Sequence, residues 1–187
     1  MPDLGKIGLF ASAGVGAFAL LLLIISVGTT VWLDDYGGNT VGLFRKCYGD
    51  NGTVINDGAG SAGLGCINEA RVTQGGLSVF GLLLLAFGVI ALIAGTILNK
   101  PPILFGALGL YYFSSMFVMA AYATWGTYSR EPYLYAFPSI PPGTDAHHQS
   151  MGASYHLCVA AHYFLWTALT VLAFAAGYTL NGERNAT

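Results

Sequence analysis

The side chains most able to do covalent chemistry in this 187-residue chain are its three cysteines, Cys47, Cys66 and Cys158. A thiol oxidoreductase needs two cysteines separated by two residues, because the second thiol resolves the mixed disulfide that the first one forms. No two cysteines of this chain have that spacing. The pattern excludes this class of enzyme and leaves Cys47 and Cys66 as residues that could pair in an oxidising compartment. Cys158 is expected to be a buried apolar thiol.

Asp145, His147 and His148 lie close together in a stretch rich in proline and aromatic residues. A solvated loop is the simpler interpretation, and a weak zinc or proton-sensing site is the alternative. The surrounding rings would make a stiff contact surface, or else an aromatic belt at a bilayer interface.

His156 and His162 are six residues apart, which places them about 240° apart around a helix, so they do not form a metal-ligand pair by themselves. His162 lies inside an apolar segment. An ionisable side chain is costly there and indicates a function by default. The structural interpretation is a neutral imidazole hydrogen-bonded across helices to Tyr111, Ser114 or Ser115.

Residues 58–63, Gly-Ala-Gly-Ser-Ala-Gly, match the pattern G-x-G-x-x-G. They lie between two cysteines and do not open a helix after a buried strand, so they are interpreted as a flexible loop and not as a dinucleotide site. No catalytic constellation is present in the sequence. We therefore expect no enzyme activity, no cofactor, no metal site and no small-molecule substrate.

Formal charges are scarce in the elements that would position these residues: 9% of the chain is charged, against about 25% in soluble domains. Four intervals carry no charge at all, namely residues 7–33, 72–99, 101–129 and 146–182. Each exceeds the roughly 20 apolar residues that cross a bilayer. The prediction is an all-α membrane protein, a bundle of four transmembrane helices with apolar cores at 7–31, 75–98, 103–125 and 155–180.

The loops that remain, 34–71 and 130–154, are too small for a separate soluble domain, so residues 1–187 are predicted to form one membrane domain. A cleaved signal peptide is the alternative interpretation of the first segment. The apolar run of this segment, however, is longer than the 7–15 apolar residues that are usual in a signal peptide. The net charge of −2 gives no basic face for nucleic acid.

Orientation is predicted from the first loop, because lysines and arginines divide almost evenly between the two sides. Asn51 begins an N-glycosylation sequon, and Cys47 and Cys66 flank it. A sequon and a cysteine pair are usable only on the lumenal or extracellular side. We therefore expect cytoplasmic termini, a glycan at Asn51 and an unused sequon at Asn185.

Small residues recur at helical spacing in two of the predicted spans. Gly81, Gly88 and Gly95 are seven residues apart and fall on one stripe, where a neighbouring backbone can approach closely. The first span has Gly8, Ser12 and Gly16 four residues apart. The turn at residues 99–102 is so short that the second and third spans must be antiparallel neighbours.

A small antiparallel sheet is predicted in the first loop region, because residues 29–33 and 40–48 are rich in β-branched and aromatic side chains and are separated by glycine-containing turns. A sheet of this size is marginal by itself. A Cys47–Cys66 bridge would stabilise it by about 3 kcal/mol.

The order of Trp32, the segment Gly42-Leu43-Phe44, Cys47, Cys66 and Arg71 resembles the W-GLW-C-C signature of the claudin-like four-span superfamily. This superfamily includes claudins, peripheral myelin and epithelial membrane proteins, calcium-channel gamma subunits and clarins. The resemblance implies an extracellular antiparallel sheet on a left-handed four-helix bundle. It also implies a Cys47–Cys66 disulfide joining two strands, with Trp32 at the membrane-facing base of the sheet.

The chain departs from the signature at Phe44, which replaces the second tryptophan, and in the longer segment between its cysteines. Residues 181–187 lack the terminal hydrophobic residue that a PDZ domain binds. Residues 108–111, Leu-Gly-Leu-Tyr, and His162 with its aromatic neighbours are similar to clarins. The branch stays open.

These features predict a non-catalytic, multi-pass plasma-membrane protein that organises cell contacts or membrane complexes through its extracellular loops, with cell junctions as a candidate location. Its expected partners are the lipid bilayer and other membrane proteins or copies of itself. The alternative is an accessory subunit of an ion channel or receptor, similar to calcium-channel gamma subunits. Such a subunit would lay its glycine-rich helices against its partner.

Overall fold

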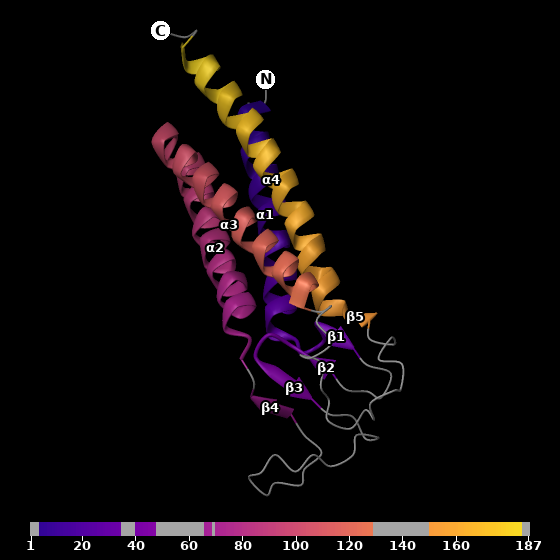
Figure 1. Cartoon of the computed structure of the whole chain (residues 1–187). Coiled ribbons are helices and arrows are strands. Elements are labelled where there is room, and N and C mark those ends of the chain that lie inside the picture. The colour runs from indigo at the N-terminus through magenta and orange to yellow at the C-terminus, as the bar shows by residue number, and fades with distance from the viewer. Residues whose placement is uncertain (1–3, 35–39, 48–65, 69, 129–149, 185–187) are drawn as a thin grey trace, which may run out of the picture.

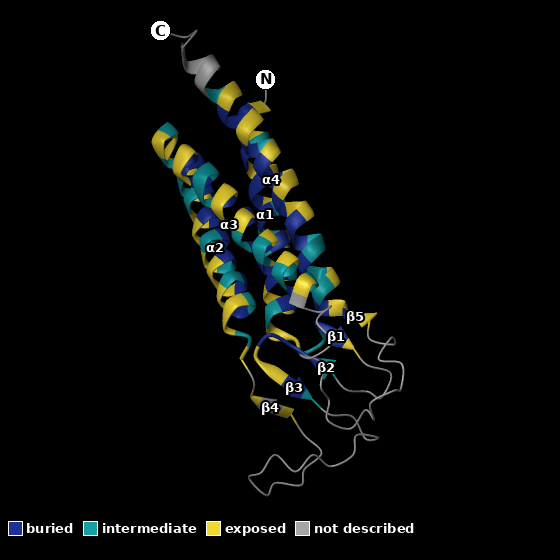
Figure 2. Cartoon of the chain, viewed as in Figure 1, coloured by how far each residue is buried: buried dark blue, intermediate teal, exposed yellow. Residues whose placement is uncertain are grey.

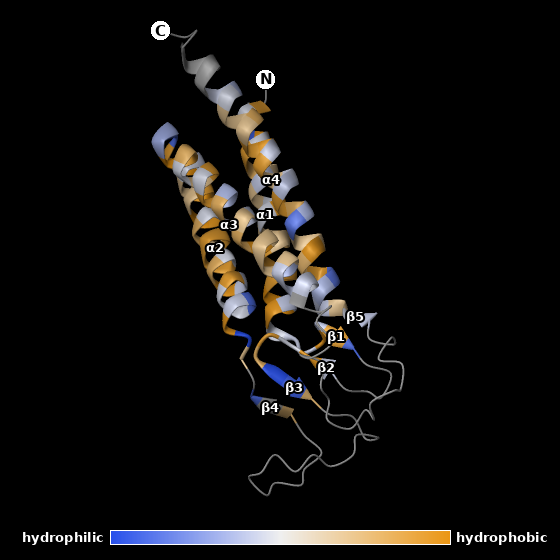
Figure 3. Cartoon of the chain, viewed as in Figure 1, coloured by the Kyte–Doolittle hydropathy of each residue, from blue (hydrophilic) through white to orange (hydrophobic). Residues whose placement is uncertain are grey.

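The computed structural model describes residues 4–34, 40–47, 66–68, 70–128 and 150–184. The described residues contain four long helices, α1 (Leu4–Gly28), α2 (Val72–Leu98), α3 (Pro101–Tyr128) and α4 (Ala153–Arg184). All four are long and apolar enough to cross a bilayer, and hydrophobic residues occur along the whole length of each bundle helix (orange in Figure 3). The chain is therefore a multi-pass membrane protein, and the predicted four-helix bundle with a small antiparallel sheet is confirmed.

The helices form a ring in which each one packs on two neighbours. The most extensive contacts join α1 to α4 and α2 to α3, and smaller contacts join α1 to α2 and α3 to α4. Buried residues face the middle of the bundle, and exposed residues face outward (Figure 2). The N-terminal end of α1 and the C-terminal end of α4 lie at one end of the bundle, and the sheet lies at the other (Figure 1).

The sheet contains five short strands among the described residues, β1 (Leu33–Asp34), β2 (Thr40–Val41), β3 (Arg45–Cys47), β4 (Cys66–Asn68) and β5 (Ser150–Met151). Their order across the sheet is β4-β3-β2-β1-β5, and every neighbouring pair is antiparallel. Four strands come from the segment between α1 and α2, and β5 comes from the segment between α3 and α4. The two loops are therefore joined in one sheet, an arrangement that was not expected from the sequence.

The prediction of extended structure over residues 29–33 was wrong for most of that segment. The helix α1 continues to Gly28, and β1 begins only at Leu33. The Thr29 side chain favours the helix end, because its Oγ1 donates to the carbonyl oxygen of Ile25 at 2.7 Å. The predicted extended segment 40–48 is divided instead into β2 and β3, with a tight connection at residues 42–44.

The buried side chains form two clusters stacked along the bundle. The first cluster lies between the helices, and its largest members include Leu85, Leu92 and Tyr111. The second cluster lies where the helices meet the sheet, and it includes Trp32 and Trp125. Cys158 belongs to the second cluster as a free, buried thiol, as the sequence predicted.

Candidate functional site at the sheet and inside the bundle

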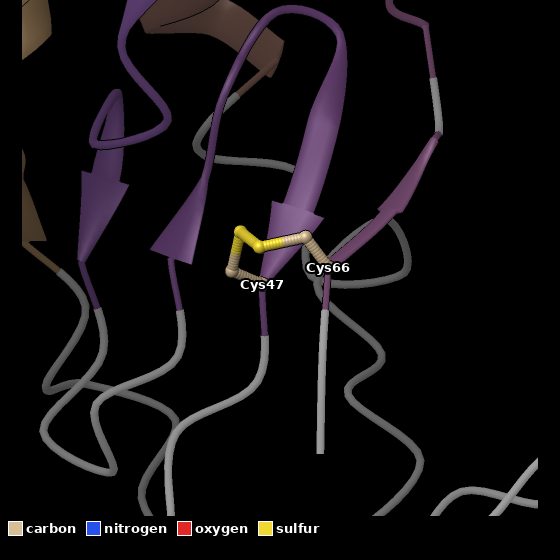
Figure 4. The surroundings of a disulfide bond; sticks show 2 residues. All are labelled: Cys47 and Cys66. Atoms are coloured by element: carbon tan, nitrogen blue, oxygen red, sulfur yellow. A yellow bond between two sulfur atoms is a disulfide. The ribbon is translucent and has the colours of Figure 1, made fainter. Parts of the chain in front are cut away.

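A disulfide bond between Cys47 and Cys66 joins β3 to the edge strand β4 (Figure 4). The two residues are direct partners in the strand register, and their Cα atoms are 4.0 Å apart. The bond closes a segment with a sequence separation of 19. It therefore holds β4 in place where only three residues pair with β3.

Trp32 connects the sheet to the helices. Its side chain is fully buried, and its indole N–H donates to the carbonyl oxygen of Ser26 at 2.8 Å. The ring packs edge-on against Trp125 of α3 and Tyr155 of α4, with centroid distances of 5.2 and 6.2 Å. The backbone N–H of Trp32 also donates to the carbonyl oxygen of Val41 at 3.0 Å. Trp32 therefore links three helices to the middle of the sheet.

The connection between β2 and β3 inserts into the end of the bundle. The N–H of Gly42 donates to the carbonyl oxygen of Arg45 at 2.8 Å, and a Cβ at Gly42 would lie only 2.7 Å from the Cα of Thr30. Glycine is therefore required at this close approach. Leu43 is fully buried in the cluster at the sheet end, and its carbonyl oxygen accepts the N–H of Arg71 at 2.7 Å.

Phe44 covers the first turn of α2. A Cβ at Gly75 would lie 2.9 Å from the Cε1 atom of the Phe44 ring. Arg71 precedes α2, and its carbonyl oxygen accepts the N–H of Gly75 at 2.7 Å. Trp32, the Gly42-Leu43-Phe44 segment and Arg71 are therefore brought together at one joint between the sheet and the bundle.

The segment before α4 is hydrogen-bonded to the same joint, a contact that the sequence does not predict. The N–H groups of Gly152 and Ser154 donate to the carbonyl oxygens of Trp32 and Val31 at 3.0 and 2.9 Å. A Cβ at Gly152 would overlap the carbonyl oxygen of Val31. The only sign of this contact in the sequence is a glycine just before the predicted fourth span, and a glycine does not show which residue it will contact.

His162 lies in α4 and forms a polar cluster with α3. Its Nε2 lies 3.2 Å from Ser115 Oγ and accepts the indole N–H of Trp166 at 2.9 Å, and its Nδ1 lies 3.2 Å from the Tyr122 hydroxyl. Of the three residues predicted to form a hydrogen bond with His162, only Ser115 does so. Ser114 Oγ instead donates to the carbonyl oxygen of Gly81 at 2.7 Å.

The third predicted partner of His162, Tyr111, lies nearer the middle of the bundle. Its side chain is fully buried, and its hydroxyl has no hydrogen-bond partner among the described residues. The ring lies against Gly88 of α2, and the hydroxyl lies against Gly16 of α1. Tyr111 therefore fills a space that two glycines leave open.

The glycine stripe of α2 faces α3. Added Cβ atoms at Gly81, Gly88 and Gly95 would lie 2.9, 2.8 and 2.9 Å from side-chain atoms of α3. Those side chains are respectively Val118, Tyr111 and Leu104. The stripe is thus occupied by α3 within the chain.

Several predicted residues lie outside the described residues, namely Asn51, residues 58–63, Asp145, His147, His148 and Asn185. Within the described part of the chain, no three His, Cys, Asp or Glu side chains lie close enough together to hold a metal ion.

No protein-family model matches the chain, and a search of the curated proteins finds no significant match.

Proposed function

We propose that this chain is a claudin-like four-span protein that organises cell contacts or membrane complexes without catalysing a reaction. The support for the family is the shared location of its motif residues. Trp32, Gly42, Leu43 and Arg71 are buried in, or hydrogen-bonded across, the joint between the sheet and the bundle. Phe44 covers α2 in the place of the second tryptophan.

The observation that carries the function is the construction of the sheet. Strands from both loops form one sheet, and a disulfide joins two of these strands. Backbone hydrogen bonds and buried rings attach the sheet to the helices. An attached sheet of this kind can present its strands in a fixed geometry. Pre-organisation reduces the entropy lost when a surface binds a partner, which suits loop-to-loop recognition.

The proposed orientation places the sheet outside the cell and both termini in the cytoplasm, in the plasma membrane and at cell junctions. The Cys47–Cys66 disulfide supports this orientation, because disulfides persist in oxidising compartments. The sequon at Asn51 belongs to the same loop. The proposed partners are copies of this chain or other membrane proteins.

The proposal is tested in cells that lack junctions and express the tagged chain in a mosaic. A contact organiser should concentrate where two expressing cells touch, and not where an expressing cell touches a non-expressing one. The double variant Cys47→Ser/Cys66→Ser should reduce this enrichment at equal surface level, whereas Cys158→Ala, which changes a cysteine in the buried core, should retain it.

No enrichment at contacts, with protein demonstrably at the surface, would contradict the proposal. That result would instead favour an accessory subunit, which should stay diffuse or be retained inside the cell until its channel or receptor partner is coexpressed.

A further inference from the structure

The hydrogen bonds around His162 determine which of its nitrogens carries hydrogen. The indole N–H of Trp166 can only donate, and it points at Nε2 from 2.9 Å. Nε2 must therefore present its lone pair, and a neutral imidazole then carries its hydrogen on Nδ1. Nδ1 lies 3.2 Å from the hydroxyl oxygen of Tyr122, so this oxygen accepts and the imidazole donates.

This direction leaves the hydroxyl hydrogen of Tyr122 without an acceptor among the described residues. The Tyr122 hydroxyl makes no other hydrogen bond among the described residues. The hydrogen bonds thus run from the N–H of Trp166 through His162 to Tyr122, and the Tyr122 O–H has no acceptor in the described part of the chain. An unpaired donor in an apolar environment is costly, so an acceptor supplied from outside the chain would be stabilised there.

The position of Tyr122 limits what can supply that acceptor. Tyr122 precedes the end of α3 at Tyr128 by six residues, or about 9 Å. A helix of 28 residues is about 42 Å long and exceeds a hydrocarbon core of about 30 Å by about 6 Å at each end if it is centred. The backbone of Tyr122 therefore lies about 3 Å inside the boundary of the hydrocarbon, and its hydroxyl is within a side chain's length of the lipid ester carbonyls and sterol hydroxyls found there.

The side chains around this hydroxyl are open to the bilayer. Tyr122 is partly exposed, and Tyr163 and Trp166 of α4 are exposed at 69% and 44%. Flat rings of this kind offer apolar contact surface to a lipid at low entropic cost.

We propose that the seam between α3 and α4 at Tyr122 is a lipid-binding site whose ligand is a bilayer lipid with an acceptor oxygen at the hydrocarbon boundary. The Tyr122 O–H donates to that oxygen, while His162 and Trp166 orient the hydroxyl. The site is independent of the proposed contact function.

The test uses the full-length chain in nanodiscs of three compositions: ester-linked phosphatidylcholine, its ether-linked analogue that lacks the carbonyls, and the ether-linked lipid with cholesterol. The Tm of the wild type should fall by about 2–5 °C from ester to ether lipid, and Tyr122→Phe should show no such fall. If cholesterol restores the Tm of the wild type, a sterol hydroxyl is sufficient as the acceptor for the Tyr122 O–H. If it does not, the acceptor is the ester carbonyl.

Tyr112→Phe is the matched control, because Tyr112 is an exposed tyrosine of α3 without a hydrogen bond to a described residue. Tyr112 lies deeper in the bilayer, about 24 Å from the sheet end of α3. This variant should respond to the lipids as the wild type does. Equal responses of the wild type and Tyr122→Phe in all three lipids would overturn the proposal.

A second measurement does not depend on whether the Tyr122→Phe variant folds. The ¹⁵N NMR spectrum should show a protonated Nδ1 and an unprotonated Nε2 in His162. A 3-fluorotyrosine placed at position 122, but not at position 112, should change its ¹⁹F shift between ester and ether lipids. The opposite tautomer, or a ¹⁹F shift that ignores the lipid, would equally overturn the site.

Discussion

At the scale of single residues, the most informative group is the buried hydroxyl of Tyr111. The tyrosine ring fits between helices because Gly16 and Gly88 leave room for it. Its hydroxyl, however, is buried without a hydrogen bond to a described residue. The shape of the side chain thus favours the fold, while its polar atom opposes it.

Tyr111→Phe should therefore stabilise the protein by about 1 kcal/mol, because the ring remains and an unsatisfied polar group is removed. Gly16→Ala should destabilise it, since the new Cβ would overlap the hydroxyl and lie 2.8 Å from the Tyr111 Cζ atom. Thermal unfolding in nanodiscs measures both changes.

Gly14→Ala is the control for this pair, because no atom lies within 4 Å of a Cβ at that position of α1. The double variant Gly16→Ala/Tyr111→Phe should recover part of the stability that Gly16→Ala loses. A loss of stability in Tyr111→Phe alone would show that the hydroxyl has a partner after all.

At the scale of elements, α2 and α3 are matched along their length. Gly81, Gly88 and Gly95 of α2 receive side chains of α3 that also recur every seven residues. Backbones can approach closely where side chains are absent, and packing of this kind is a main source of helix association in lipid. The regular stripe therefore belongs to the internal structure of the bundle.

Gly88→Ala should destabilise the bundle by about 1–3 kcal/mol, because its Cβ would lie 2.8 Å from the Tyr111 ring in a filled space. Gly88→Leu should prevent folding. The matched control is Gly76→Ala, also in α2, which meets no atom within 4 Å and should be neutral or slightly stabilising. Equal Tm values for Gly88→Ala and Gly76→Ala would refute the internal role of the stripe.

The sheet depends on its disulfide, because each strand contributes only two or three residues. Cys47→Ser and Cys66→Ser should each cost about 3 kcal/mol and cause retention in the secretory pathway. The double variant should be no worse than either single variant, since all three remove the same bond. Surface biotinylation and unfolding in nanodiscs measure these effects, with Cys158→Ala as a milder control. Two free thiols at positions 47 and 66 in surface protein would rule out this role.

At the scale of the whole molecule, both chain ends of the bundle lie opposite the sheet (Figure 1). This arrangement requires Asn51 and Asn185 to be on different sides of a membrane, because one belongs to the sheet loop and the other follows α4. Only one of the two sequons can therefore be glycosylated.

Treatment with a glycosidase should shift the expressed protein on a gel by one glycan, and Asn51→Gln should abolish the shift. Asn185→Gln is the control and should migrate like the wild type. A glycan on Asn185 would invert the proposed orientation of the entire chain.

The sequence by itself determined the four membrane helices, because transfer of a helix into lipid depends on the length and composition of a local segment. It also indicated the small residues at which helices can approach, since helical spacing alone places them on one stripe. The cysteine pair and the motif residues could be identified for the same reason, as each is a pattern of residue types along the chain.

Only the tertiary structure decided which groups meet across the bundle. The α3 side chains that fill the glycine stripe, the His162 contacts to Tyr122 and Ser115, and the β5 strand that joins the first loop all depend on the rotation and register of separate elements. These contacts join residues far apart in the sequence. No local pattern specifies them, because a glycine or a histidine shows what a position permits and not which neighbour occupies it.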